Sequence, residues 1–136
     1  MKKQVVILAV SLLLSAATVF GQTLKPNDGG ILTKEAIDNY MVGINSGNDG
    51  VRISSAYFLG EYKVEEAIIP LMKMLSNEKT DEGRIIAALS LTKIGTGKAV
   101  YAVKQAAKFD DSQRVRDLCA RFYNSYALSA ESGSEL

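Results

Sequence analysis

Apolar residues recur at every third or fourth position through six consecutive segments between residues 35 and 127. This spacing places the apolar side chains on one face of an α-helix, so each segment is expected to be an amphipathic helix. Clusters of Gly, Asn, Asp and Ser separate the segments, as turns between helices require. The alternation of apolar and polar residues that is typical of strands is absent from the sequence. The pattern therefore predicts an all-α fold.

The six segments are of two kinds, which alternate along the chain and repeat. The first kind, called A here, recurs at a spacing of 32 residues: VRISSAYFLG (51–60), GRIIAALSLT (83–92) and VRDLCARFYN (115–124). The second kind, called B, precedes each A segment: EAIDNYMVGI (35–44), EEAIIPLMKML (65–75) and GKAVYAVKQAA (97–107). Repetition at such a period is typical of helical solenoids. We therefore expect a short α-α superhelix of about six helices.

The repeat resembles a known family. Arg-x-x-small-Ala-x-x-Leu-Gly, followed by Ala-Ile/Val-x-x-Leu, is similar to HEAT repeats, especially the short ones of phycobilisome lyases. The pattern stands here as RISSAYFLG with EEAIIPLM and as RIIAALSLTKIG with KAVYAV, and three units in register cover about residues 35–127. The third unit departs from it, because Tyr123 and Asn124 replace Leu-Gly and no B segment follows. The resemblance implies a HEAT-like solenoid whose B helices line the concave surface.

Individual residues suggest where the helices begin and end. Asp49, Asp81 and Ser112 precede A segments and are predicted to be N-caps, because their side-chain oxygens accept hydrogen bonds from first-turn amides. Gly60 is expected to mark a turn. Pro70 falls within a B segment, where a proline is costly unless it lies in the first turn. That helix is therefore expected to begin late or to kink.

Residues 1–21 are predicted to be a signal peptide. Lys2 and Lys3 precede an apolar run at 5–20, which is shorter than the roughly 20 residues that span a bilayer. We expect cleavage before Gln22 and an exported protein, either periplasmic or secreted. The alternative is that the segment is retained as a membrane anchor, which would be the protein's only contact with a membrane.

The remaining chain divides into three parts by composition. Residues 22–32 contain turn formers without a period and are expected to be a flexible linker, and residues 33–128 should form the HEAT-like repeat domain. Residues 129–136 are small, polar and acidic, and we expect a disordered tail. Once the two signal-peptide lysines are removed, 14 basic residues face 15 acidic ones. This balance argues against a nucleic-acid partner.

The sequence offers little catalytic chemistry. Histidine, the commonest general base and metal ligand, does not occur. Ser90 and Lys93 match the S-x-x-K spacing of penicillin-binding enzymes, but the Ser-Asp-Asn and Lys-Thr-Gly motifs that accompany it are missing. The single cysteine, Cys119, shares its repeat column with Ser55 and Ala87, which indicates a small, buried site and an inert thiol. We expect no catalytic residues, no cofactor and no metal site, and we expect Ser90→Ala to be nearly silent.

Three arginines occupy one column of the repeat, Arg52, Arg84 and Arg116. A row of guanidinium groups is able to hold an acidic ligand. Alternatively, each arginine pairs with a turn acid in its own or the next repeat, as HEAT-like arrays do with Arg and Asp. We favour the second interpretation, a structural ladder, because exposed ion pairs of this kind need no ligand.

Binding is most plausible on the B helices. Ile69, Met72 and Tyr101 are expected to lie near solvent beside Lys73 and Lys104, and together these five residues form a candidate protein-contact patch. The alternative is that the same residues pack against the next helix.

The favoured function is an exported protein-interaction module, a scaffold or adaptor with no catalytic activity, that binds an unidentified protein or peptide. One alternative is an accessory to small-molecule or chromophore chemistry, by analogy with lyase-like HEAT proteins. Another is a structural spacer in an envelope complex. Asp117 and Arg121 replace apolar residues of the first two A segments, so we expect a capped array and a monomer.

Overall fold

The computed structural model describes residues 33–132, which form α-helices, one short 3-10 helix (η1) and no strand. The elements in chain order are α2 (Lys34–Gly43), α3 (Asp49–Glu61), η1 (Glu65–Ala67), α4 (Ile68–Asn77), α5 (Asp81–Ile94), α6 (Gly97–Phe109) and α7 (Gln113–Ser132). The prediction of an all-α fold is confirmed. The predicted signal peptide (1–21), the predicted linker (22–32) and the last residues (133–136) lie outside the described residues.

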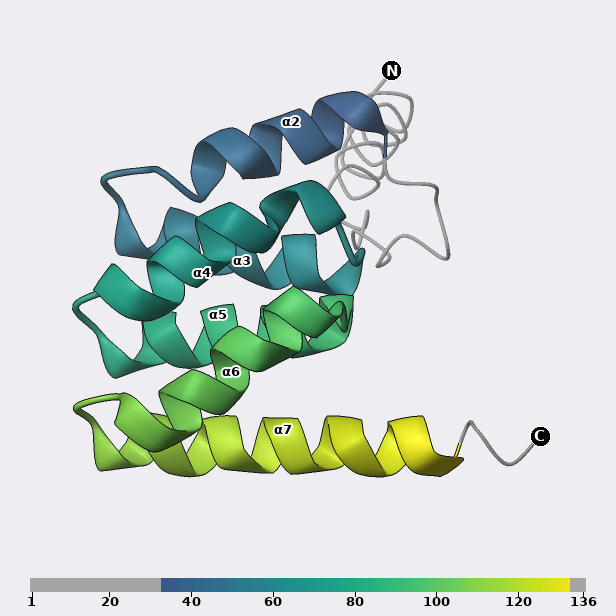
Figure 1. Cartoon of the computed structure of the whole chain (residues 1–136). Helices are drawn as coiled ribbons and strands as arrows, with labels where there is room; N and C mark the ends of the chain where they lie inside the picture. Colours follow the sequence, from purple (N-terminus) through teal and green to yellow (C-terminus); the bar gives the residue numbers. More distant parts are fainter. Residues whose placement is uncertain (1–32, 133–136) are drawn as a thin grey trace, which may run out of the picture. The chain divides into compact units, whose positions relative to one another are not determined.

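The helices are arranged as three successive hairpins, each made of a B helix followed by an A helix. α2 packs on α3, α4 on α5, and α6 on α7. The A helices α3, α5 and α7 also pack on one another in that order, so α5 is central (Figure 1). This order of contacts is compatible with the expected superhelical stack. None of the helices in residues 33–132 is both long and apolar enough to cross a membrane.

The core is made of large apolar side chains from the central helices and of small residues between them. Leu59, Leu71, Leu91, Val103 and Val115 are fully buried. The 3.6-residue period predicts their inward positions, since each lies on the apolar face of its helix. Burying such a side chain stabilises the fold by about 1.5–3 kcal/mol.

The caps of α3 and α5 lie one residue earlier than predicted. Asn48 accepts a hydrogen bond from the amide of Val51 at 3.1 Å, and Thr80 accepts one from the amide of Gly83 at 3.2 Å. Asp49 and Asp81, the expected caps, are instead the first residues of their helices. Either neighbour offers a suitable side-chain oxygen, so the sequence alone does not separate them. Ser112 precedes α7 and accepts from the amide of Val115, as predicted.

Pro70 lies in the first turn of its helix. The B segment opens with η1, and α4 begins at Ile68, two residues before the proline. An amide in the first turn has no partner within the helix, so the missing N–H costs nothing there. The late start predicted from Pro70 is confirmed.

Gly60 does not mark a turn, contrary to the prediction. It lies inside α3, where a Cβ atom would stand 2.5 Å from the Cα atom of Ser90 on α5. No real Cβ approaches a backbone atom that closely, so α3 and α5 meet at a distance that only glycine permits. The residue serves helix packing.

The predicted disorder of 129–136 is wrong for its first four residues, because α7 continues to Ser132. Extending a helix that is already packed requires no new nucleation, which is the costly step for an isolated segment. Ser129 and Ser132 also donate hydrogen bonds to backbone carbonyls three residues earlier. Residues 129–132 therefore form the exposed end of a helix, although their composition is typical of disorder.

Candidate binding groove

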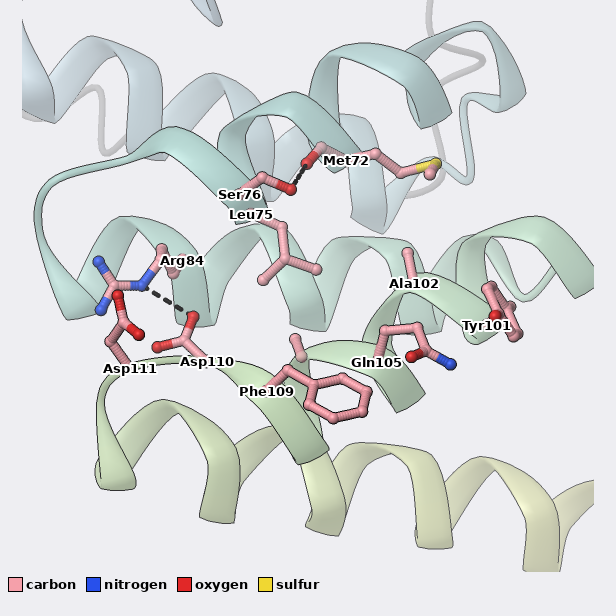
Figure 2. A pocket seen from close by; sticks show the side chains of 11 residues that line it. Met72, Leu75, Ser76, Arg84, Tyr101, Ala102, Gln105, Phe109, Asp110 and Asp111 are labelled. Atoms are coloured by element: carbon pink, nitrogen blue, oxygen red, sulfur yellow. Dashed lines mark hydrogen bonds and ion pairs between the residues drawn. The ribbon is translucent and has the colours of Figure 1, made fainter.

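A groove of about 420 Å³ lies between the B helices α4 and α6 (Figure 2). From α4 it is lined by Met72, Leu75 and Ser76, and from α6 by Tyr101, Ala102, Gln105, Ala106 and Phe109. The volume falls within the range of sites that bind small molecules or single side chains. Arg84, Asp110 and Asp111 lie at one end of the groove, where loops connect the helices.

The α6 wall follows from the spacing of its residues. Tyr101, Gln105 and Phe109 are four residues apart and therefore lie on one face of the helix. The opposite face supplies Val103 to the core. The two rings are held at the open rim, since Tyr101 is 62% exposed and Phe109 is 73% exposed. Large apolar groups left in solvent along the wall of a concavity are typical of a contact surface.

The structure brings together only part of the predicted contact patch. Met72 and Tyr101 both line the groove. Ile69 is 56% exposed and Lys73 is also exposed, but neither side chain lines it. The ammonium group of Lys104 lies 5.1 Å from the centre of the Tyr123 ring on α7, outside the groove.

Sequence reasoning missed Gln105 as a member of the patch, and Phe109 altogether. Both continue the four-residue spacing from Tyr101, and this spacing was the available indication. Phe109 went unnoticed because the matching repeat segment stops at residue 107, whereas α6 continues to residue 109.

A second group of exposed rings was also missed, on the first hairpin. The Phe58 ring lies 5.1 Å from that of Tyr40, 5.5 Å from that of Tyr57 and 6.4 Å from that of Tyr62, centre to centre. None of these aromatic residues recurs in the second unit, and only Phe58 and Tyr62 recur in the third, as Phe122 and Tyr126, so the repeat columns gave little indication of the group. The ring of Tyr40 on α2 stacks on that of Phe58 on α3 and thereby fastens the first hairpin.

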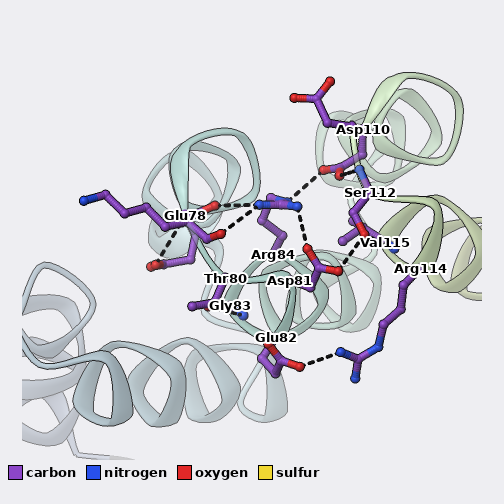
Figure 3. Close-up of polar contacts among 12 residues, drawn as sticks. Glu78, Thr80, Asp81, Glu82, Gly83, Arg84, Asp110, Ser112, Arg114 and Val115 are labelled. Atoms are coloured by element: carbon purple, nitrogen blue, oxygen red, sulfur yellow. Dashed lines mark hydrogen bonds and ion pairs between the residues drawn. The ribbon is translucent and has the colours of Figure 1, made fainter.

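The charged end of the groove is a preorganised network around Arg84 (Figure 3). Its Nη2 donates to Asp81 at 2.8 Å, and its Nη1 donates to the backbone carbonyl of Glu78 at 2.8 Å. The buried Nε lies 3.0 Å from a carboxylate oxygen of Asp110, an ion pair without hydrogen-bond alignment. The guanidinium group is therefore occupied by the protein's own carboxylates.

Arg52 repeats these contacts one unit earlier. Its Nε and Nη2 each reach a carboxylate oxygen of Glu78 at 2.9 Å, and Nη2 also donates to Asp49 at 2.8 Å. Nη1 donates to the carbonyl of Ser46. Because Arg52 donates to Glu78, the pKa of that carboxyl lies below its usual value. Glu78 stands 26 residues after Arg52, as Asp110 does after Arg84. The same arginine–carboxylate pair therefore connects successive loops.

Arg116 keeps the local contacts but lacks a comparable ion pair within residues 33–132. Its Nη1 donates to the carbonyls of Asp110 and Asp111, and its Nη2 donates to the side-chain oxygen of Gln113 at 2.6 Å. Gln113 thus stands where the earlier units have an aspartate. Arg52 and Arg84 therefore link successive loops as a structural ladder, whereas the contacts described for Arg116 stay within its own unit.

The two residues with possible nucleophilic chemistry are held in helix contacts. Ser90 is 1% exposed and its hydroxyl donates to the carbonyl of Ala56 at 2.7 Å, while Lys93 pairs with Glu61. Ser90→Ala would remove a buried hydrogen bond, so our expectation that it is silent needs correction. Cys119 is fully buried, and burial raises the pKa of its thiol to about 12.

No group of three or more Cys, Asp or Glu side chains is placed to hold a metal ion in the part of the chain that the structure describes. In comparisons with known proteins, no family model matches the chain, and no curated protein is significantly similar to it.

Proposed function

We propose that this protein is an exported, HEAT-like interaction module, a scaffold or adaptor without catalytic activity, that binds a segment of another protein in the groove between α4 and α6. The observation that carries the proposal is the exposure of Tyr101 and Phe109 along the α6 wall of a concave surface. Aromatic residues are enriched at the centres of protein interfaces, where burial of their rings supplies much of the binding energy. Export is supported by the pattern of residues 1–21.

The HEAT-like character is supported by three features. The hairpins repeat at a spacing of 32 residues, the A helices pack in series, and the column of arginines ties successive loops together. In this arrangement α4 and α6 are neighbouring B helices, and the resemblance to HEAT repeats assigns B helices to the concave surface. A partner segment bound there would contact two repeats at once.

An accessory role in small-molecule chemistry is the second candidate, because the volume of the groove falls within the usual range for such ligands. A pocket of this kind normally buries most of its ligand. Here the two rings stand largely in solvent, which favours a larger partner that covers them. A spacer in an envelope complex would make contacts that do not depend on the groove.

Site-specific photo-crosslinking in the native host tests the proposal. Gln105, which lies between the two rings, is replaced by p-benzoyl-phenylalanine in the full chain, and exposed Arg121 on α7 receives the same probe as a control. We expect irradiation to join position 105, but not position 121, to one discrete protein. The double substitution Tyr101→Ala/Phe109→Ala should abolish this product. Equal products from both positions, or none from position 105, would refute the groove as the binding site.

A further inference from the structure

We infer that the groove takes an acidic-apolar segment, in which two carboxylates about five residues apart flank an aromatic or branched aliphatic side chain. The inference rests on the proposed function and specifies the chemistry of the partner. It combines the exposed lysines of α4 and α6, which lie outside the groove lining, with the two exposed rings.

The charged residues of α4 and α6 themselves are all of one sign. α4 and α6 together carry Lys73, Lys98, Lys104 and Lys108, and they contain no aspartate or glutamate. Lys73, Lys98 and Lys108 are exposed, and the described part of the chain provides none of them with an ion pair. The ammonium group of Lys104 lies over the Tyr123 ring. The ammonium groups of Lys73, Lys98 and Lys108 are therefore available to an anionic partner.

The lysines are placed in register with the rings. Lys98 lies three residues before Tyr101 and Lys108 lies seven residues after it, so all three share one face of α6. The ten residues from Lys98 to Lys108 rise about 15 Å along the helix. An extended peptide covers that distance in about five residues. A segment lying along α6 is thus able to place one carboxylate near each lysine and an apolar side chain between Tyr101 and Phe109.

The acidic residues near the groove limit where the partner's carboxylates fit. Asp110 is paired with Arg84, but Asp111 is exposed at the loop end. A second negative charge beyond Lys108 would be repelled by Asp111. The favourable region for carboxylates therefore extends along α6 and stops at this loop.

A peptide fits these features better than a nucleic acid or an anionic membrane. The formal net charge of the whole chain is only +1, which gives little of the field that attracts phosphate backbones. A groove of about 420 Å³ with rings at its rim is also suited to binding an apolar side chain. Carboxylates at a defined spacing with an apolar group between them are a property of peptides.

Fluorescence anisotropy with labelled peptides and the full chain tests this inference. The probe is Ser-Glu-Ser-Phe-Leu-Ser-Glu-Ser, and two matched peptides carry Lys in place of both Glu, or Ser in place of Phe and Leu. We expect each change to weaken binding by about tenfold, because one removes the charge attraction and the other the apolar anchor. Lys98→Glu/Lys108→Glu should weaken the acidic peptide to a similar degree and improve the lysine peptide.

The control is Lys79→Glu/Arg121→Glu, which changes the net charge equally at exposed positions outside α4 and α6. It should alter affinity less than twofold, and circular dichroism should show that both variants remain helical. Equal affinity for the acidic and lysine peptides, or no binding of the acidic peptide, would overturn the inference. So would binding of heparin fragments or anionic vesicles with the same lysine dependence when the acidic peptide does not bind. Because photo-crosslinking at position 105 does not depend on the partner's charge, it still tests the proposed function in each of these cases.

Discussion

Single residues set how closely the A helices approach one another. Gly60 on α3 faces Ser90 on α5, whose hydroxyl donates to the carbonyl of Ala56. Ala56 and Ala88 are fully buried in the same contact region. Small side chains bring the two backbones together, and the serine satisfies its buried hydroxyl by bonding across the interface. The contact therefore depends on residue size as much as on hydrophobicity.

Gly60→Ala should destabilise the protein strongly. The new methyl group would stand 2.5 Å from a backbone Cα, so α3 and α5 must separate. Overpacking of this kind costs about 1–3 kcal/mol. Urea denaturation followed by circular dichroism measures the loss. Gly97→Ala is the matched control, because no atom lies within 4 Å of its added Cβ, and it should be neutral or slightly stabilising. Equal stability of the two variants would contradict the close approach.

Cys119 should not react while the protein is folded. Its thiol is fully buried, and a pKa of about 12 leaves almost none of it as the reactive thiolate at pH 8. We expect no reaction with Ellman's reagent in buffer and one thiol per chain after denaturation. Ser54→Cys in a Cys119→Ala background places a thiol at an exposed position of α3 and should react at once. Rapid labelling of native Cys119 would show that α7 opens readily.

At the level of helices and loops, the arginine ladder adds polar contacts between units whose A helices already pack on one another. Arg52 joins the loop before α3 to Glu78 in the next loop, and Arg84 does the same with Asp110. On the A helices, Lys93 pairs with Glu61 and Arg114 with Glu82, residues one repeat apart. The buried ladder has stronger consequences than the exposed pairs, since a buried charge that loses its partner is costly.

Glu78→Gln tests the ladder through its pH dependence. The folded-state pKa of Glu78 lies below its usual value, chiefly because Arg52 donates to it. The pair therefore stabilises the fold above the unfolded pKa of about 4.5, and this stability is lost as the pH falls through the lower folded pKa. We expect Glu78→Gln to cost about 1–3 kcal/mol at pH 7 and progressively less toward pH 3.

Chemical denaturation at several pH values provides the measurement. Glu82→Gln is the control, because its pair with Arg114 is largely exposed and should contribute less at any pH. A loss for Glu78→Gln that does not change with pH would mean that its effect is not electrostatic.

The sequence predicts the elements better than the details of their contacts. The helices and their inward faces follow from the apolar period, and the arginine column follows from the repeat. The cap positions of α3 and α5 were missed by one residue, since adjacent polar residues compete for the role. Gly60 was misinterpreted because a glycine at a helix crossing and one in a turn look alike in sequence. The C-terminal extension was missed because composition does not reveal that α7 is already anchored by packing.

The site was predictable only in part, for a geometric reason. Met72 and Tyr101 were identified because both occupy repeat columns beside the core positions of the B helices, and both line the groove. Which other residues join them depends on how α4 and α6 are rotated and how they cross, and periodicity does not determine either. Lys104 was therefore placed in the patch, although it lies against Tyr123. Phe109 completes the groove because α6 runs two residues beyond the repeat match.

At the scale of the whole helical array, the outer face of α7 decides whether the stack can continue. Asp117 and Arg121 are exposed on α7, and Gln113 donates to the Asp117 carboxylate at 2.7 Å. The equivalent positions in the earlier units include Ile53 and Ile85, which are partly buried and pack against the core. The face that joins one A helix to the next is thus polar in the third unit. Helical arrays need such a face at a terminal unit to prevent stacking with other molecules.

We therefore expect a monomer whose α7 acts as a cap, and light scattering with Asp117→Ile/Arg121→Leu provides the test. Restoring apolar side chains on this face should make the variant self-associate, because an A helix of a second molecule would bury the exposed apolar surface. Asp117→Asn/Arg121→Gln removes the charges without adding apolar surface and should stay monomeric. That control distinguishes the effect of removing the two charges from the effect of adding exposed apolar surface. A wild-type dimer dispersed by the apolar substitutions would instead show that Asp117 and Arg121 form an interface between two copies.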